Sequence, residues 1–482
     1  MKVDEYIQYD AVGLADLVRT KQVTPSQLLD AAVARKQAVN PQINAVVVDL
    51  EPLARRAIDE GLPAGPLHGV PTLLKDISTQ MKGVRTTAGS RLYAEAPVSQ
   101  ADSAIVAAYR ASGLNIMGKS NTPEFGLAPV TEPRLYGKTR NPWSLDRTPG
   151  GSSGGAAAAV AAGIVPAAQA SDGGGSIRIP ASCCGLVGMK PSRGRVSLAP
   201  MGEGWGSMTV LNAVSRTVRD SAIFLDISSK PQPGDPYALP APARSFLEEA
   251  STSPGRLKIG FTTAALAMGR DVDAPCATAV RETARLCEDL GHDVEEVTLP
   301  FGFNFSVLAG GILVAATLAN MFDQEAGRRG RPITPDEVEL LTWMTVERGR
   351  SVTGPGYVQA LNAIHKFGRE LSSVFADYDV LLLSTLASLP IPLGSMDTQG
   401  QDIGSYSDRF YRFVPNTQAF NAAGMPAISL PLGWSTEGLP IGMQFAANYG
   451  REDILFRLAG QLEQARPWAG RRPKVMLENA QA

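Results

Sequence analysis

Two glycine-rich clusters stand out in the chain, residues 150–155 (GGSSGG) and 172–178 (DGGGSIR). Glycine lets the backbone turn sharply, so each cluster predicts a tight turn. The residues between them predict an alanine-rich helix over 155–162 and a strand over 164–170 that only Pro166 interrupts. The same alternation of short apolar runs and helices extends through residues 61–230. A chain that alternates in this way is expected to fold as an α/β protein.

The two clusters also carry a candidate nucleophile. They present Ser152 and Ser176, 24 positions apart, and Lys75 lies 77 positions before the first of these serines. Successive glycines expose backbone N–H groups that can converge on a bound carbonyl oxygen. A lysine amine becomes a useful base at neutral pH only if burial lowers its pKa from about 10.4. Hydroxyls in tightly turned backbone plus one isolated amine are the parts of a serine nucleophile that works without histidine.

Each of these features has another interpretation when it is taken alone. A glycine run is also typical of a flexible loop or an anion-binding nest, and a Lys-Asp pair such as Lys75-Asp76 is compatible with a salt bridge. Residues 150–154 match the G-x-S-x-G pattern of Ser-His-Asp hydrolases, which requires a buried strand directly before it. Residues 141–149 are turn-forming instead. The three histidines lie outside glycine-rich and acidic clusters: His68, His292 and His365.

Taken together, the motifs are similar to those of a known family. The chain resembles the amidase signature family over nearly its whole length, and it is least typical at residues 230–256 and 300–415. The resemblance rests on Lys75 and on six segments: 150–155, 172–180, Cys184-Gly185, 190–195 (KPSRGR), 421–426 and 438–444 (GLPIGMQ). Residues 131–133 and 139–143 are most similar to members that cleave aryl acylamides and nylon-type amides.

The resemblance implies a role for each site residue. Ser176 is expected to be the nucleophile, Ser152 the proton relay held by a cis peptide bond, and Lys75 the base. The oxyanion hole and the supporting residues carry over in the same way: backbone N–H groups of Gly173, Gly174, Gly175 and Ser176 for the hole, and Asp172, Arg178 and Ser153 for support. Gly173 stands where Thr or Ile is common in the family, so a side chain that stiffens the loop is lost. No metal or cofactor is implied.

The resemblance also implies the architecture, a single large, mixed, twisted β-sheet covered by helices on both sides. Residues 1–60 are expected to form an N-terminal helical layer, with a capping box that starts a helix at Thr24. Residues 61–482 then form the signature domain, with a catalytic core at 61–230. The region at about 300–415 is expected to vary with the substrate.

Several further elements are predicted from apolar periodicity. Residues 257–299 predict a strand, a helix and a second strand, and residues 301–376 are mainly helical. Proline-rich residues 230–256 predict a surface crossing, and residues 388–410 predict a loop. The remaining predicted elements are strands at 380–384, 427–432 and 441–445 and a helix at 452–464.

Composition limits the function classes. The net charge is −2 and basic runs are absent, which excludes a nucleic-acid or anionic-lipid partner. The N-terminus has no apolar run typical of a signal peptide. The four cysteines form no disulfide framework and no CxxC pair, which favours a cytoplasmic protein. The uncharged residues 301–322 are interpreted as a buried or pocket-lining segment rather than a membrane span.

Together with these observations, the resemblance implies an amide hydrolase that acts through an acyl-enzyme on a small, hydrophobic or aryl carboxylic amide. Esters and carbamates share the carbonyl geometry and are expected as side activities. The pocket is expected to draw on residues 124–134, Trp205, 301–322 and 398–415. The protein is expected to be a monomer or a homodimer. Three alternatives stay open: the amidase subunit of a tRNA-dependent amidotransferase, a Ser-His-Asp esterase, and a catalytically silent binding protein.

Overall fold

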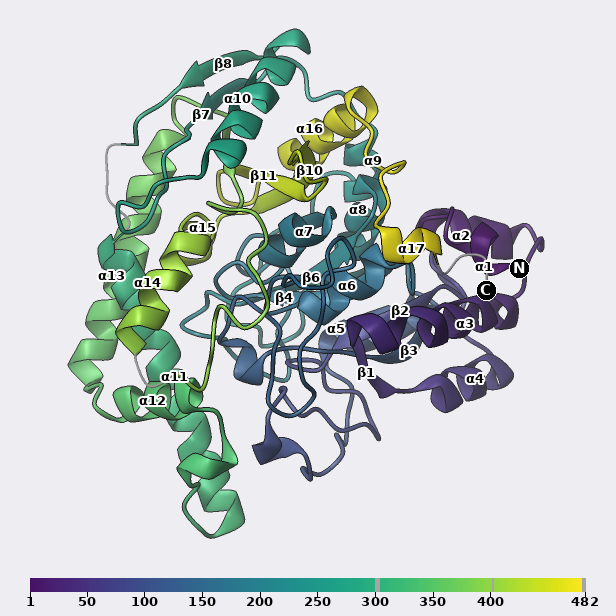
Figure 1. Cartoon of the computed structure of the whole chain (residues 1–482), viewed down its shortest axis with the longest axis horizontal. Coiled ribbons are helices and arrows are strands. Elements are labelled where there is room, and N and C mark those ends of the chain that lie inside the picture. The colour runs from purple at the N-terminus through teal and green to yellow at the C-terminus, as the bar shows by residue number, and fades with distance from the viewer. Residues whose placement is uncertain (300–303, 401–402, 479–482) are drawn as a thin grey trace.

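The centre of the molecule is a mixed sheet of eight strands (Figure 1). The computed structural model describes residues 1–299, 304–400 and 403–478. Across the sheet the order is β4-β6-β5-β10-β11-β9-β7-β8, in which β7 runs parallel to β8 and β9 and the other pairs are antiparallel. The bounds are β4 (Ala167–Asp172), β5 (Val187–Lys190), β6 (Val210–Ser215), β7 (Lys258–Phe261), β8 (Asp293–Glu296), β9 (Val380–Ser384), β10 (Ala427–Trp434) and β11 (Pro440–Ala447). The predicted large mixed sheet is confirmed.

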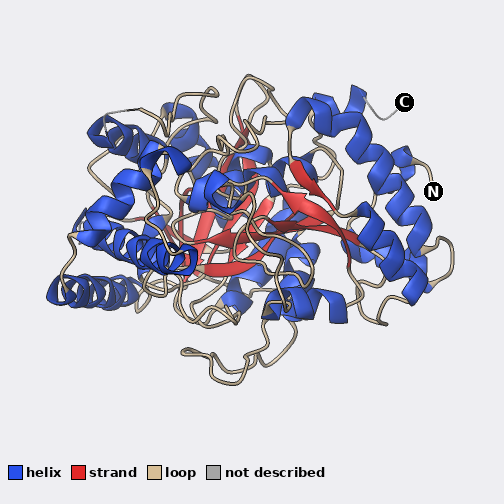
Figure 2. Ribbon diagram, turned by 90° about the horizontal axis from the view of Figure 1, so that it is seen from below, coloured by secondary structure: helices blue, strands red, loops and turns tan. Residues whose placement is uncertain are grey.

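Helices cover both faces of this sheet, as Figure 2 shows. Strands β4, β5, β6, β9 and β11 are buried at every residue. A strand that is covered on both faces needs an apolar or small residue at nearly every position. This explains why the strands appear in the sequence as continuous short apolar runs rather than as alternating patterns.

Three further strands form their own hydrogen-bonded ladder, in the order β1-β3-β2. They are β1 (Val46–Asp49), β2 (Pro71–Lys75) and β3 (Asn115–Ser120). Side chains join β2 to β4: Thr72 Oγ1 donates to the carbonyl of Ala167 at 3.0 Å, and Lys75 N–H donates to Gln169 Oε1 at 3.1 Å. The end of β2, where Lys75 lies, is therefore held beside the large sheet.

The N-terminal helices pack against one another beside the short C-terminal helix α17 (Figure 1). The capping box predicted at Thr24 is present, because its Oγ1 accepts from Gln27 N–H and the Gln27 side chain accepts from Thr24 N–H. The guanidinium of Arg35 is fully buried and donates to carbonyls of α17. The bounds are α1 (Val3–Tyr6), α2 (Ala11–Arg19), α3 (Pro25–Ile43), α4 (Glu51–Glu60) and α17 (Lys474–Glu478).

Helix α6 (Gly154–Ala161) is buried along its whole length in the middle of the fold. Glycine and alanine are required there because other segments approach the helix closely. A Cβ atom at Gly155 would lie 2.3 Å from the backbone nitrogen of Asn121. Helix α7 (Arg178–Cys184) packs against α6. Four further helices pack against one another: α5 (Ala104–Ala111), α8 (Val218–Ser228), α9 (Phe246–Ala250) and α16 (Glu452–Ala465).

The predicted β-α-β unit in residues 257–299 is confirmed: β7 and β8 are parallel and α10 (Ala274–Asp289) connects them. Cys276 and Cys287 are buried thiols on α10. The predicted surface crossing at 230–256 contains the short helix α9, which Ser245 and Glu248 cap.

Residues 304–374 form three helices, as predicted, while residues 301–303 lie outside the described part of the chain. These helices are α11 (Asn304–Arg329), α12 (Leu340–Arg350) and α13 (Gly354–Val374). No helix within the described residues combines the length and the apolarity that a bilayer crossing requires. Buried residues of α11, such as Leu313 and Phe322, face the protein core.

The loop predicted at 388–410 is wrong from residue 403 onward, where α14 (Ile403–Phe413) begins. Tyr406, Phe410 and Phe413 lie on one face of this helix and supply its packing. The glycines, prolines and serines of the preceding residues hid this apolar period in the sequence. The short helix α15 (Gln418–Ala422) follows.

Candidate active site

Lys75 is fully buried at the end of β2. Its Nζ donates to Ser152 Oγ at 2.7 Å and to Ser171 Oγ at 2.9 Å. Burial lowers the pKa of the Lys75 amine to about 7, although the Asp172 carboxylate opposes the shift. A large fraction of this amine is therefore neutral near pH 7 and can accept a proton. Sequence reasoning missed Ser171, because a single serine at the end of a strand carries no motif.

Ser152 follows a cis peptide bond, Gly151–Ser152, as the resemblance implies. The next residue, Ser153, connects the two glycine-rich clusters. Its backbone N–H donates to the carbonyl of Ser176 at 3.3 Å, and its Oγ donates to the carbonyl of Ser171 at 3.2 Å. Ser153 precedes α6, but its side chain makes no capping hydrogen bond. It supports the geometry of the two clusters instead.

Asp172 and Arg178 form a fully buried ion pair that braces the second cluster. Arg178 donates from Nε and Nη2 to the two carboxylate oxygens, each at 3.0 Å. The carboxylate also accepts from the backbone N–H groups of Gly175, at 2.7 Å, and Ile177, at 3.1 Å. Burial alone raises the pKa of Asp172, but the Arg178 charge and hydrogen bonds outweigh it and lower that pKa to about 2. Arg178 further donates to the C-terminal segment, at Thr417 O, Asn421 Oδ1 and Gln444 Oε1.

The backbone N–H groups of the second cluster are not all available to a substrate. Those of Gly173, Gly174 and Ser176 have no acceptor within the described residues. The N–H of Gly175, which the resemblance also assigned to the oxyanion hole, donates to Asp172. In this structure a carboxylate therefore occupies one of the four N–H groups that the resemblance assigned to the hole.

Trp205 explains the glycine at position 173. A Cβ atom there would lie 2.5 Å from Cε3 of the Trp205 indole, so no larger residue fits. The indole occupies the space that the side chain of Thr or Ile would need. Trp205 therefore packs directly on the cluster that carries Ser176.

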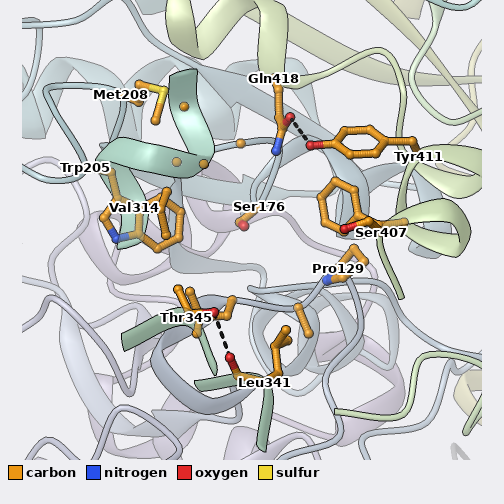
Figure 3. Close-up of a pocket in the computed structure, with 18 of the residues that line it drawn as sticks. Pro129, Ser176, Trp205, Met208, Val314, Leu341, Thr345, Ser407, Tyr411 and Gln418 are labelled. Atoms are coloured by element: carbon orange, nitrogen blue, oxygen red, sulfur yellow. Dashed lines mark hydrogen bonds between the residues drawn. The ribbon is translucent and has the colours of Figure 1, made fainter. Parts of the chain in front are cut away.

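Ser176 is half-buried at the junction of two cavities. Cavity 1 has a volume of about 220 Å³ and cavity 2 has a volume of about 400 Å³. Ser152 lines only cavity 2. Four residues line both: Gly126, Gly173, Ser176 and Trp205. Figure 3 shows cavity 1, with Ser176 among side chains from several separate segments. A carbonyl carbon at Ser176 can therefore extend one substituent into each cavity.

Comparison with known proteins identifies the family. The model described as Amidase matches residues 27–456. The chain belongs to the amidase signature family. The 6-aminohexanoate-cyclic-dimer hydrolase of Pseudomonas sp. (strain NK87) is 38% identical over 487 residues, with 98% of each chain covered. A solved 6-aminohexanoate cyclic dimer hydrolase complexed with substrate has a TM-score of 0.94 and 37% identity over 98% of this chain and 99% of that chain.

A bacterial aryl acylamidase of the same family is also similar, with a TM-score of 0.85 and 26% identity over 98% of this chain and 99% of that chain. The family and these relatives establish the chain as an amidase. They also agree with the resemblance drawn from the serine, glycine and lysine motifs.

The predicted segments supply much of the wall of cavity 1 in this amidase. Cavity 2 is lined mostly by residues 77–103 and 198–209, of which the sequence predicted only Trp205 as part of a pocket wall. Residues 126–129, Trp205 and parts of α11 and α14 all contribute. Leu313 does not line either cavity, because it packs in the core against Gly206. Sequence reasoning missed the contributions of Met208, Leu341, Thr345, Arg348 and Gln418. These residues belong to ordinary helices or loops, and the packing of α12 and α15 against α11 brings those on the two helices to the cavity.

A buried carboxylate attaches α12 to the wall of the amidase site. Glu124 accepts from the backbone N–H of Glu339, at 2.7 Å, and from Thr342 Oγ1, at 2.6 Å, at the start of α12. It also accepts from Ser90 Oγ at 2.6 Å. Burial raises the pKa of Glu124 to about 7. Because residue 126 lines both cavities, Glu124 fixes the cavity wall relative to α12.

The three histidines of the amidase are not among the described residues that line the two cavities. His68 contacts the carbonyl of Pro63, and His292 contacts Leu257 N–H and Gln461. Burial and nearby arginines lower the pKa of His365 on α13. None of the described residues that line either cavity is a histidine.

Proposed function

We propose that this amidase hydrolyses small carboxylic amides through an acyl-enzyme on Ser176, with Ser152 as the proton relay and Lys75 as the base. The observation that carries the proposal is the 2.7 Å hydrogen bond between Lys75 Nζ and Ser152 Oγ. Burial gives that amine a pKa of about 7, the value that suits a general base near neutral pH.

In the first step, Ser176 Oγ attacks the amide carbonyl carbon. Its proton passes to Ser152 Oγ while the Ser152 proton passes to the neutral Lys75 amine. The carbonyl oxygen becomes an oxyanion, for which the N–H groups of Gly173, Gly174 and Ser176 are the free donors. Asp172 and Arg178 keep these donors in place.

In the second step, the C–N bond breaks and the proton returns from Lys75, through Ser152, to the leaving nitrogen. Water then attacks the acyl-enzyme by the same relay, which releases the carboxylic acid and restores Ser176. Because Ser152 lines only cavity 2, we place the leaving amine in cavity 2. The acyl group then lies in cavity 1.

The cavity walls favour substrates with apolar or aryl parts. Cavity 1 includes Trp205, Met208, Val314 and Phe410, and cavity 2 includes Leu318. The names of the relatives specify a cyclic 6-aminohexanoate dimer and aryl acylamides. We therefore propose hydrophobic or aryl amides as the substrate class. Esters and carbamates present the same carbonyl and are proposed as side activities.

The state of the four cysteines favours one cellular compartment for the enzyme. All four are buried free thiols, and burial raises the pKa of Cys276 and Cys287 to about 12. Such thiols need no oxidising compartment, so we propose that the enzyme is cytoplasmic. We propose that its partner is the small-molecule amide and that it is a monomer or homodimer.

Active-site labelling tests the proposal. A sulfonyl fluoride should modify Ser176, and peptide mass spectrometry should locate it there. Ser176→Ala should abolish anilide hydrolysis with an unchanged circular dichroism spectrum. The triple variant His68→Gln, His292→Gln, His365→Gln should keep measurable activity if it is folded. Labelling at Ser152, or complete inactivity of a folded triple variant, would favour a Ser-His-Asp mechanism instead.

A further inference from the structure

Cavity 1 holds an unpaired positive charge. Arg348, on α12, is the sole charged side chain among the described residues that line it. The guanidinium lies over Gly311, where a Cβ atom would be 3.9 Å from its Nη1. Arg348 is also close enough to Tyr411 for its charge to lower the pKa of that phenol, against the larger raising effect of burial. No carboxylate within the described residues forms an ion pair with it.

The neighbouring arginine on the same helix behaves differently. Arg350 donates to Glu347 Oε1 at 2.6 Å and to Asp323 Oδ1 at 3.0 Å. It lies over the Trp343 ring and lines neither cavity. Both arginines are exposed, but only Arg350 has acidic partners within the described residues and only Arg348 lines cavity 1. A guanidinium without a partner presents a planar set of donors that suits a carboxylate.

Cavity 2 carries the opposite charge. Glu203 is the sole charged side chain among the described residues that line it. A carboxylate there disfavours an anion in cavity 2 by like-charge repulsion. An amide with one anionic end is therefore directed to place that end in cavity 1. The preference for this orientation comes from Arg348 and Glu203 together.

We propose that Arg348 binds a carboxylate at the far end of the acyl group, so that this amidase prefers monoamides of dicarboxylic acids. The inference rests on the proposed function, because the position of Ser152 in cavity 2 assigns cavity 1 to the acyl half. The methylene chain of such an acyl group lies against the apolar wall, which includes Val314 and Met208. The neutral aryl amine then occupies cavity 2.

The test compares matched anilides. The substrates are succinyl, glutaryl and adipoyl 4-nitroanilides and the alkanoyl 4-nitroanilides with the same number of acyl carbons. The wild-type enzyme should show a higher kcat/KM for at least one carboxylate substrate than for its neutral match. Arg348→Met should lower this ratio at least ~10-fold, mainly through KM, because a charge-assisted hydrogen bond is lost. Arg348→Lys should retain part of the ratio, and added salt should reduce the wild-type ratio.

Arg350→Met is the matched control, since it removes an arginine of the same helix that lines neither cavity. It should leave the ratio within ~2-fold of wild type, as expected for an exposed ion pair. N-Acyl-4-aminobenzoates, which carry the carboxylate on the amine half, should be poor substrates that do not depend on Arg348.

Three results would overturn the inference. In the first, the enzyme hydrolyses neutral anilides, but the ratio of kcat/KM for a carboxylate anilide to that for its neutral match is equal in wild type and Arg348→Met. This result leaves the proposed function intact. A second is an Arg348-dependent preference for the aminobenzoates, which reverses the placement of the two halves. The third is a wild-type enzyme that hydrolyses no amide and is not acylated at Ser176, which removes the proposed function as well.

Discussion

The Nζ atom of Lys75 lies 2.7 Å from the Oγ atom of Ser152, although 77 positions separate the two residues. Neither residue is exposed, and the contact joins the end of β2 to the turn that begins α6. Because the amine is buried away from water, it donates hydrogen bonds to the hydroxyl groups of Ser152 and Ser171 instead. In the proposed mechanism, this contact supplies a base without a histidine.

The pH profile should report Lys75. Its pKa is lowered to about 7, so the amine gains its proton, and ceases to be a base, as the pH falls through that value. We expect kcat/KM for a neutral anilide to rise from pH 5.5 to pH 8.5 with an apparent pKa near 7. Lys75→Met and Lys75→Arg should each lower kcat at least ~10²-fold, because neither side chain acts as a base. A flat profile, or an active Lys75→Arg variant, would contradict this role.

Asp172→Asn should destabilise the fold and lower kcat. The change leaves the buried Arg178 without its counter-charge, which costs about 3–5 kcal/mol in unfolding free energy. The pKa of Asp172 is about 2 in the folded chain, below its ordinary value of 3.8, so its contribution is present above pH 3.8 and is lost as the pH falls toward 2. Urea denaturation measures the effect. Asp16→Asn, at an exposed ion pair with Arg19, is the control and should change stability by less than ~1 kcal/mol.

Glu124→Gln should change how stability depends on pH. The folded protein holds the Glu124 proton up to a pH of about 7, while the unfolded chain loses it near 4.5. The contribution of Glu124 to the free energy of unfolding therefore decreases as the pH rises from 4.5 to 7. Glutamine does not titrate, so the variant lacks this decrease. Between pH 4.5 and pH 8, the free energy of unfolding of the variant should therefore rise by up to ~3 kcal/mol relative to that of wild type. Glu282→Gln, at an exposed position of α10, serves as the control, and an equal response of both variants would refute the prediction.

Bulky substitutions at Val314 and Thr317 should affect the recognition of different halves of the substrate. Both belong to α11, but Val314 lines cavity 1 and Thr317 lines cavity 2. Val314→Trp fills the proposed acyl cavity, so it should lower kcat/KM for hexanoyl anilide at least ~10-fold more than for acetanilide. Thr317→Trp should discriminate instead between bulky and small amines with the same acyl group. The reverse pattern would place the acyl group in cavity 2.

Several features of the site follow from local residue chemistry. A run such as residues 172–178 turns sharply because glycine imposes no Cβ constraint, and its acid at position 172 bonds to its own loop. The capping box at Thr24 and the buried strand β9 are equally local, so the sequence predicts them directly. The helix α14 was within reach of the same reasoning, because Tyr406, Phe410 and Phe413 show its period.

Other features depend on contacts between distant segments. Gly175 N–H is a candidate oxyanion donor in the sequence, but its use by Asp172 depends on how the loop closes. Leu313 and Val314 are neighbours in one apolar run, yet one is core and the other lines a cavity. The direction in which α11 packs decides between them, and periodicity alone leaves that direction open.

The sequence by itself determined the family, the α/β class and the three residues of the proposed relay, because each depends on motifs whose spacing is fixed along the chain. The tertiary structure alone decided that Lys75 is buried beside Ser152, that Ser176 lies between two cavities and that Arg348 lines one of them. Burial, pKa and cavity charge are properties of neighbours in space. They arise only when strands and helices that are far apart in the sequence pack together.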